Sequence, residues 1–137
     1  MAFAQDMLDA KGFFENKGWK VVLPDGIEDY INDTKWKKRA AGWGTLEGAK
    51  RKIENDLIIK HFEEIKKSDA ILVINKTKNK IRNYIGGNTF LEMGFAHVLG
   101  KKIFILNPLP TTQKMIHQEL VAMQPIAIKG DLKKIKI

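Results

Sequence analysis

The stretches that decide the fold are "AILVIN", residues 70–75, and "KIFILN", residues 102–107. Continuous apolar runs of this length are typical of parallel strands that are covered on both faces. A polar loop ending in glycines, residues 76–87, separates the first run from an apolar helical pattern that extends to about Leu99. Gly100 is a natural stop for that helix. Strand, helix and strand in this order predict a parallel β-α-β unit.

Working outward, an amphipathic pattern predicts a helix over residues 3–17 that Gly18 ends. The run "WKVVLP", residues 19–24, is rich in β-formers and predicts a strand ended by its proline. One helical turn is expected near residues 27–31, followed by a long helix from Leu46 to about Lys67 with Thr45 as its cap. The predicted core face of that helix consists of Leu46, Ala49, Ile53, Leu57, Phe62 and Ile65. A helix over residues 113–123 and a more exposed strand over residues 125–130 complete the chain.

Alternating helices and strands predict the α/β class, with a three-layer, doubly wound parallel sheet of the flavodoxin or Rossmann-like type. The 137 residues suit a single domain over residues 1–137. Such folds normally begin with a strand, whereas this sequence begins with a helical pattern. The expected sheet therefore lacks the usual first strand, and its absence would leave strand edges unpaired.

The composition, with 44% hydrophobic and 29% charged residues, is ordinary for a globular protein. There are no cysteines, so disulfides and thiolate zinc sites are excluded, which fits a cytoplasmic location. No apolar run has the length of a membrane span, and the N-terminus does not resemble a secretory signal. The net charge of +8 favours anionic ligands. Without a recognition motif, small anions are favoured over nucleic acid.

In an open α/β sheet, ligands bind at the carboxyl ends of the strands, where the strand order reverses. The loop before the apolar helix and the first turn of that helix should lie there. Gly86 and Gly87 permit close backbone approach or a positive φ, and Asn88 and Thr89 are candidate helix caps. These four residues are therefore the first candidates for substrate binding.

Glu92 is a carboxylate within an otherwise apolar helix. One interpretation is a capping box, in which Thr89 is the cap and Glu92 bonds back to its backbone N–H. The other is a nucleophile or general base in a closed pocket, where desolvation would raise its pKa and the helix N-terminus would lower it. Residue spacing does not decide between these two interpretations.

Two segments, "SDAILVIN" at residues 68–75 and "GGNTFLEMGFAHVLGKKIFIL" at residues 86–106, resemble the nucleoside 2-deoxyribosyltransferase family. That family includes the deoxynucleoside 5′-monophosphate N-glycosidases. "GWKVVLP", residues 18–24, is similar to its second strand. The matching positions are Asp69, Asn88, Thr89, Glu92, Gly94, Ala96, Gly100, Lys101 and Lys102.

The resemblance implies that Glu92 attacks C1′ of a 2-deoxyribosyl group and forms a glycosyl ester, which another base or water resolves. Asn88 matches a position where the transferases commonly have aspartate. Neither a cofactor nor a metal ion is implied. Family members often complete their sites across a subunit interface, so a homodimer or higher homo-oligomer is expected.

Three further residues are candidates for substrate binding. Tyr84 could contact the sugar or Glu92, or else pack its loop onto the body of the protein. Asn107 follows a central strand, where a polar ligand contact or a turn is expected. Trp43 lies in a segment with basic residues and glycines, and could stack on a nucleobase or pack at a subunit contact. The histidines lack metal-ligand spacing, so no metal site is predicted.

The leading hypothesis is an enzyme that cleaves or transfers the N-glycosidic bond of a deoxynucleoside or its 5′-monophosphate, with Glu92 as catalytic residue. The first alternative is a nucleotide-binding module of the same fold without catalysis. The second is a nucleic-acid-binding domain that uses its basic loops. A membrane partner is not expected.

Overall fold

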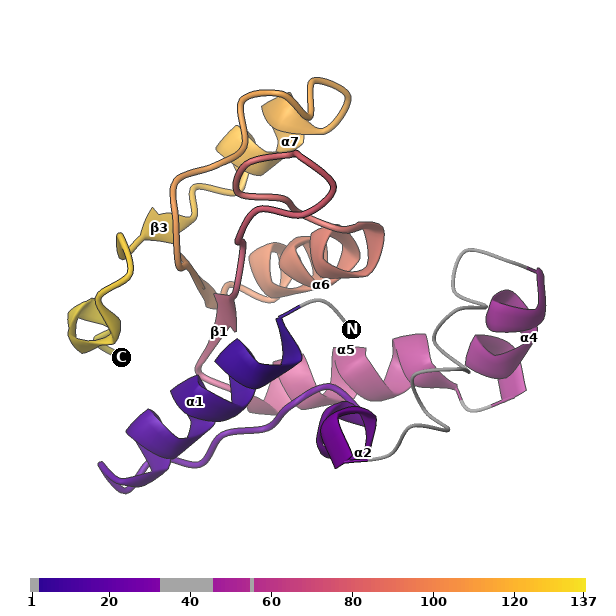
Figure 1. Ribbon diagram of the computed structural model, residues 1–137, viewed down its shortest axis with the longest axis horizontal. Helices are drawn as coiled ribbons and strands as arrows, with labels where there is room; N and C mark the ends of the chain where they lie inside the picture. Colours follow the sequence, from indigo (N-terminus) through magenta and orange to yellow (C-terminus); the bar gives the residue numbers. More distant parts are fainter. Residues whose placement is uncertain (1–2, 33–45, 55) are drawn as a thin grey trace. The chain divides into compact units, whose positions relative to one another are not determined.

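The computed structural model describes residues 3–32, 46–54 and 56–137 (Figure 1). The chain divides into two compact units, Met1–His61 and Phe62–Ile137. The regular secondary structure of the first unit's described residues consists of helices, and the second unit contains the parallel sheet. No helix in these described ranges has both the length and the apolar character that crossing a membrane requires.

In the first unit, helix α1 (Ala4–Glu15) begins the described fold. Its buried residues are Ala4, Ala10 and Phe14, which confirms an amphipathic helix here. The helix ends close to the predicted position, because Gly18 has a φ of +82° and its N–H donates to the Glu15 carbonyl at 2.9 Å. A left-handed residue after the last turn is a common way for a helix to stop, and glycine adopts it without strain.

Residues 19–24 are not a strand, which corrects the prediction from "WKVVLP". Trp19 folds back onto the end of α1: its N–H donates to the Phe14 carbonyl, and its ring stacks on the Phe14 ring with centroids 5.1 Å apart. A strand needs a neighbouring strand for its backbone groups. Among the described residues, residues 19–24 pair with none of the three strands of the sheet. The predicted helical turn that follows is confirmed as α2 (Ile27–Asn32).

The long helix predicted from Leu46 is two helices, α4 (Leu46–Glu54) and α5 (Leu57–Lys67). Asp56, between them, has a left-handed backbone with φ +50°, which a continuing helix does not allow. The predicted core face is correspondingly wrong over α4, where Leu46 is 85% and Ile53 is 74% exposed. In α5 it is confirmed for Ile65, which is buried.

The second unit is built on a three-stranded parallel sheet in the order β1-β2-β3. Strand β1 (Ala70–Val73) pairs in register with β2 (Lys102–Ile105), so that Val73 lies beside Ile105. Strand β3 (Ile126–Ala127) pairs with the other edge of β2. Both predicted central strands are therefore confirmed, and so is the α/β class. The described strands run in sequence order, so the reversal that would mark a ligand crevice does not occur among them.

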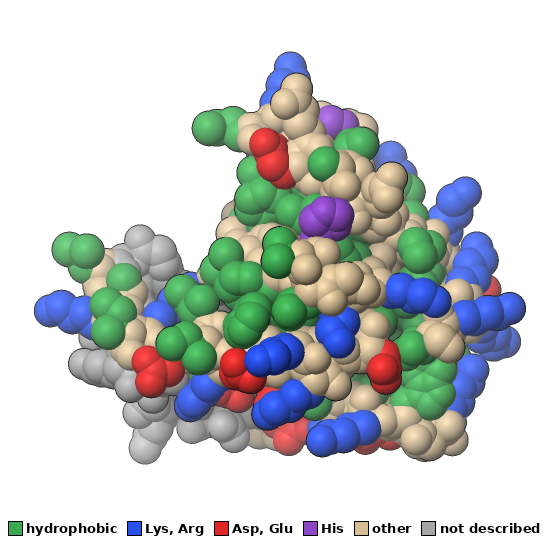
Figure 2. Space-filling view, turned by 180° about the vertical axis from the view of Figure 1, so that it is seen from behind, with side chains coloured by type: hydrophobic (Ala, Val, Ile, Leu, Met, Phe, Trp, Pro, Cys, Tyr) green, Lys and Arg blue, Asp and Glu red, His purple; other side chains and the backbone are tan. Residues whose placement is uncertain are grey.

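Helix α6 (Gly87–Val98) packs against β1 and β2. Met93 and Ala96 on its inner side are completely buried, and the Phe95 ring meets the Phe62 ring edge-on at 5.4 Å. Hydrophobic side chains also come to the surface on the face seen in Figure 2. Two exposed hydrophobic residues belong to α6, because Leu91 is 42% and Val98 is 83% exposed. The apolar composition of this helix therefore does not mean burial on every side.

The chain after β2 is less regular than predicted. The expected helix over residues 113–123 is confirmed only as α7 (His117–Ala122), which contributes the buried Leu120 to the core. The expected last strand is reduced to the two residues of β3. A 3-10 helix, η1 (Leu132–Lys134), follows, and the Asp131 side chain caps it by accepting from the Lys133 N–H at 3.0 Å.

Two glycines, Gly94 within α6 and Gly100 after its end, should respond in opposite directions to substitution by alanine. A Cβ at Gly94 or at Gly100 would meet nothing within 4 Å, so sterics are equal at the two positions. Gly94 lies within the helix, where alanine should raise the free energy of unfolding by about 0.5–1 kcal/mol. Gly100 has a φ of +69°, so alanine there should lower it by about 1–2 kcal/mol. Urea denaturation of both variants tests this, and equal effects would contradict it.

Candidate functional site

The candidate site residues lie at the carboxyl ends of β1 and β2. After β1 the chain runs through residues 74–86 into the first turn of α6, and after β2 it runs through residues 106–116 into α7. Figure 1 shows these two connections on the same side of the sheet. This is the edge at which parallel α/β sheets bind ligands. Most of the predicted site residues are therefore brought to one end of the second unit.

Helix α6 begins one turn earlier than the capping residues predicted. Its N-cap is Gly86, with an extended backbone, and no side chain caps it. Asn88 and Thr89 are therefore inside the first turn and are not caps, which corrects that prediction. The capping box is also wrong, because it needs its carboxylate three residues after the cap, and Glu92 is six residues after Gly86. Neither Gly86 nor Gly87 has a positive φ, so the backbone conformation at these two positions does not require glycine.

Glu92 lies in the second turn of α6 and is half-buried. Residues four apart in a helix lie above one another on the same face. Glu92 therefore lies between the exposed Asn88, four residues before it, and the completely buried Ala96, four residues after it. The carboxylate is thus in a half-buried position, one turn beyond the exposed start of α6.

Tyr84 lies beside the start of α6. A Cβ added at Gly86 would be 3.4 Å from the Tyr84 ring, so the ring contacts the backbone at the N-cap. The Tyr84 N–H donates to the Lys76 carbonyl at 3.0 Å, and the Lys78 ammonium lies 5.4 Å from the ring centroid. Tyr84 therefore packs its own loop, as one of its two predicted roles requires, and it remains close to the first turn of α6.

Asn75 and Asn107 form a reciprocal pair directly beyond β1 and β2. They continue the register of the strands, because both Val73–Ile105 and Asn75–Asn107 are 32 residues apart. The Asn75 amide donates to the Asn107 and Pro108 carbonyls at 2.9 and 3.1 Å, and its oxygen accepts from the Asn107 N–H at 2.8 Å. The Asn107 amide donates to the Asn75 carbonyl at 3.0 Å. Asn75 is completely buried, so this pair is a structural clamp.

Gln113 forms a second clamp that sequence reasoning missed. Its Oε1 accepts from the Ile85 N–H, and its Nε2 donates to the Ile85 carbonyl, both at 2.8 Å. The side-chain amide thus pairs with a backbone residue as a neighbouring strand would. Ile85 is only 2% exposed and directly precedes the N-cap of α6. Gln113 therefore fixes the loop on which Tyr84, Gly86 and the first turn of α6 depend.

Replacing Gln113 with alanine should lower the free energy of unfolding by about 2 kcal/mol. Two hydrogen bonds are lost, and the buried Ile85 N–H and carbonyl are left without their partner. Gln118→Ala is the matched control, because Gln118 is exposed in α7, and it should change stability by less than about 0.5 kcal/mol. Thermal and urea unfolding measure both variants. Similar stability of the two would contradict the clamp.

The remaining predicted site residues do not add to this cluster. Gly87 and Asn88 are exposed in the first turn of α6, and Thr89 is half-buried. Trp43 lies outside the described residues. Within residues 3–32, 46–54 and 56–137, no three histidine, aspartate or glutamate side chains come together as a metal site requires.

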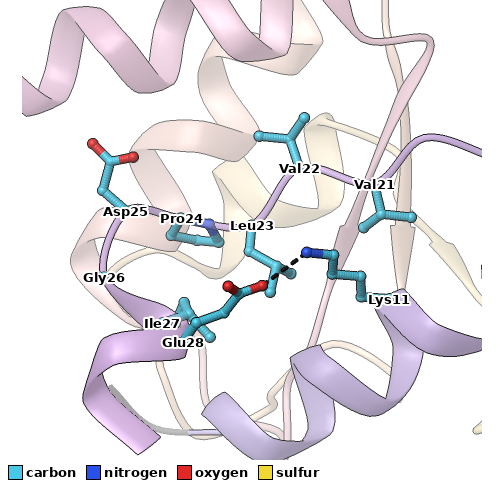
Figure 3. Close-up of a pocket in the computed structure, with 9 residues that line it drawn as sticks. All are labelled: Lys11, Val21, Val22, Leu23, Pro24, Asp25, Gly26, Ile27 and Glu28. Carbon is cyan, nitrogen blue, oxygen red and sulfur yellow. Dashed lines mark hydrogen bonds and ion pairs between the residues drawn. The ribbon is translucent and has the colours of Figure 1, made fainter. Parts of the chain in front are cut away.

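A hollow of about 340 Å³ occurs in the first unit, lined by Lys11 and residues 21–28 (Figure 3). The Lys11 ammonium donates to the Glu28 carboxylate at 2.8 Å across it, which raises the pKa of Lys11. The rest of the lining is a short extended segment with apolar side chains, ended by Asp25 and Gly26. Among the predicted site residues that the structure describes, none lines this hollow.

The chain matches no protein-family model, no curated protein sequence and no solved structure. The resemblance to the nucleoside 2-deoxyribosyltransferases therefore stays a prediction from the residues of two segments.

Proposed function

We propose that this protein cleaves or transfers the N-glycosidic bond of a deoxynucleoside or its 5′-monophosphate. Glu92 is the nucleophile, and the first turn of α6 with Tyr84 forms the sugar site. We also propose that the chain has the doubly wound, three-layer architecture that the sequence predicts. The three parallel strands would form part of its sheet. The proposed reaction needs no cofactor and no metal ion.

The proposed reaction has two steps. In the first, a Glu92 carboxylate oxygen bonds to C1′ while the bond from C1′ to the base nitrogen breaks; the electron pair of that bond goes to the base nitrogen, which takes a proton from water. In the second, water or another base attacks C1′ and releases the carboxylate. Two displacements at one carbon retain its configuration. A 2-deoxy sugar favours this route, because no electron-withdrawing 2-hydroxyl opposes positive charge at C1′.

The observation that supports this proposal is the position of Glu92. An N-terminal carboxylate that served only its helix would be expected at the third position, where it caps the backbone. Glu92 is half-buried one turn further along, on the same face as the completely buried Ala96. This position is one turn beyond the exposed Gly87 and Asn88, so a ligand bound at the start of α6 could meet the carboxylate.

The other residues have supporting roles in the proposal. Gly87 and Asn88 are exposed in the first turn of α6, and the N-terminal turn of a helix suits an oxygen-rich ligand. Asn107 does not contact the substrate in this proposal; its hydrogen bonds with Asn75 hold together the two segments that follow β1 and β2. We also propose a cytoplasmic homodimer or higher homo-oligomer, which the exposed Leu91 and Val98 on α6 support, since exposed apolar surface favours association.

The experiment is incubation of the purified protein with each deoxynucleoside and deoxynucleoside monophosphate, with chromatography of the released base. Intact-mass spectrometry after acid quenching should show an added deoxyribosyl or deoxyribosyl-phosphate group, and peptide mapping should place it on Glu92. Base exchange in the presence of a second free base would indicate transfer. Nucleotide binding by calorimetry without base release would overturn the enzymatic proposal and support a non-catalytic nucleotide-binding module.

A further inference from the structure

The loop between β1 and α6 contains a hairpin with four cationic side chains, which we call the cationic hairpin (residues 76–82). Its sequence is "KTKNKIR", and Lys76, Lys78, Lys80 and Arg82 are all exposed. The hairpin contains no aspartate or glutamate, and the nearest carboxylates along the chain are Asp69 and Glu92. On the face of the molecule in Figure 2, blue Lys and Arg side chains also predominate over red Asp and Glu.

The tip of the cationic hairpin is a tight two-residue turn. The Lys78 N–H donates to the Ile81 carbonyl at 3.0 Å, and the Ile81 N–H donates to the Lys78 carbonyl at 2.9 Å. Between them, Asn79 and Lys80 both have left-handed backbones, with φ of +50° and +63°. This is the pattern of a type I′ hairpin turn, whose twist matches that of paired strands. The cations therefore project from a defined backbone.

The base of the hairpin is held at two points. The Tyr84 N–H donates to the Lys76 carbonyl, which closes the loop, and the Tyr84 ring lies under the Lys78 ammonium. Gln113 then pairs with both backbone groups of Ile85. A binding element that is ordered beforehand loses less conformational entropy on association. The hairpin is thus a pre-ordered, cationic projection at the carboxyl end of the sheet.

We propose that the cationic hairpin binds the phosphate backbone of a single-stranded nucleic acid. Four closely spaced cations exceed the charge of one phosphate group, so they suit a ligand with several phosphates in a row. Lysine and arginine contacts to phosphates release counterions, and this drives binding without sequence preference. This binding is independent of the chemistry proposed for Glu92.

Two other polyanionic partners fit the hairpin less well. An anionic membrane also attracts clustered cations, but it is bound more tightly by a surface that in addition inserts apolar or aromatic side chains. The exposed residues of the hairpin are lysine, threonine, asparagine and arginine, with none of that kind. A duplex presents its phosphates on a stiff cylinder, and even single recognition modules bury about 600–1,000 Å² of protein against it. A flexible single strand can follow one narrow projection.

Fluorescence anisotropy with a labelled oligothymidylate of about 12 nucleotides, at salt concentrations between about 50 and 200 mM, tests this proposal. The triple variant K78Q/K80Q/R82Q should weaken binding by at least about tenfold at the lowest salt. Its slope of log affinity against log salt should fall by about 2, because each single-strand phosphate contact contributes about 0.7. The charge-conserving variant K78R/K80R should bind as the wild type does.

The matched control is K133Q/K134Q/K136Q, which removes the same charge from three exposed lysines near the C-terminus. It should keep the wild-type slope, and equal losses in the two triple variants would overturn the proposal in favour of diffuse charge. Absence of wild-type binding at the lowest salt would overturn it as well. Tighter binding to a duplex of the same length, or to phosphatidylserine vesicles, would show that the partner class is wrong. Circular dichroism should show wild-type folding for every variant.

Discussion

Replacing Glu92 with glutamine should lower the rate of base release by roughly 10³-fold or more, the range seen when an enzyme loses its nucleophile. Glutamine has nearly the same shape but cannot displace the base from C1′, so no glycosyl ester should form. Because glutamine keeps the size and the accepting oxygen of the glutamate side chain, the free energy of unfolding should change by less than about 1 kcal/mol. Chromatographic base-release assays and urea denaturation of the same preparation measure the two effects.

Glu63→Gln is the matched control for this experiment. Glu63 is another half-buried glutamate, located in α5, and it has no place in the proposed site. Its substitution should leave the rate of base release unchanged within about twofold, as expected for a residue outside the reaction. If Glu92→Gln instead lost several kcal/mol of stability and kept its activity, Glu92 would be a structural residue, and the proposed nucleophile would be wrong.

Replacing Asn75 with alanine should lower the free energy of unfolding by about 3–4 kcal/mol. The completely buried side chain makes three hydrogen bonds, and all three partners are backbone groups of Asn107 and Pro108. Each lost hydrogen bond contributes about 1 kcal/mol, and the unpaired buried groups add to this. The melting temperature should fall by roughly 10 °C or more. Differential scanning calorimetry and urea denaturation provide the measurement.

Asn107→Ala is the comparison variant, because it shows whether the stability loss is specific to Asn75 or common to substitutions at this edge of the sheet. Asn107 is only half-buried, and its side chain donates a single hydrogen bond, to the Asn75 carbonyl. Its loss should therefore lower stability by about 1 kcal/mol. A larger loss at Asn107 than at Asn75 would contradict the assignment of Asn75 as the central residue of the pair.

The elements that the sequence predicted correctly are those in which local pattern and tertiary packing agree. The apolar runs at β1 and β2 are strands because their side chains are buried on pairing, as Ile103, Phe104 and Ile105 are. The end of α1 near Gly18 and the end of α6 near Gly100 follow from the positive φ that glycine accepts. These features depend on residues close together in the chain, so one sequence is enough to find them.

The failures occurred where a long-range partner decides the outcome. Residues 19–24 have strand-forming side chains, but a strand also needs a neighbour in the sheet. The apolar side of α4 predicted a core face, yet Leu46 and Ile53 are exposed. An amphipathic pattern identifies an apolar helix face, but it does not show which other element packs against that face. Thr89 satisfied the spacing of a capping box, but the backbone turned into the helix three residues earlier, at Gly86.

The sequence by itself determined the α/β class, the two central strands, the apolar helix between them and the presence of one carboxylate in that helix. These follow from periodicity and local conformational preference, which act within a few residues of each other. Only the tertiary structure decided that Glu92 shares its face with a buried alanine, that Asn75 and Asn107 pair 32 residues apart, and that Gln113 holds Ile85. Hydrogen bonds between distant segments depend on strand register and chain path, and no local pattern encodes either of them.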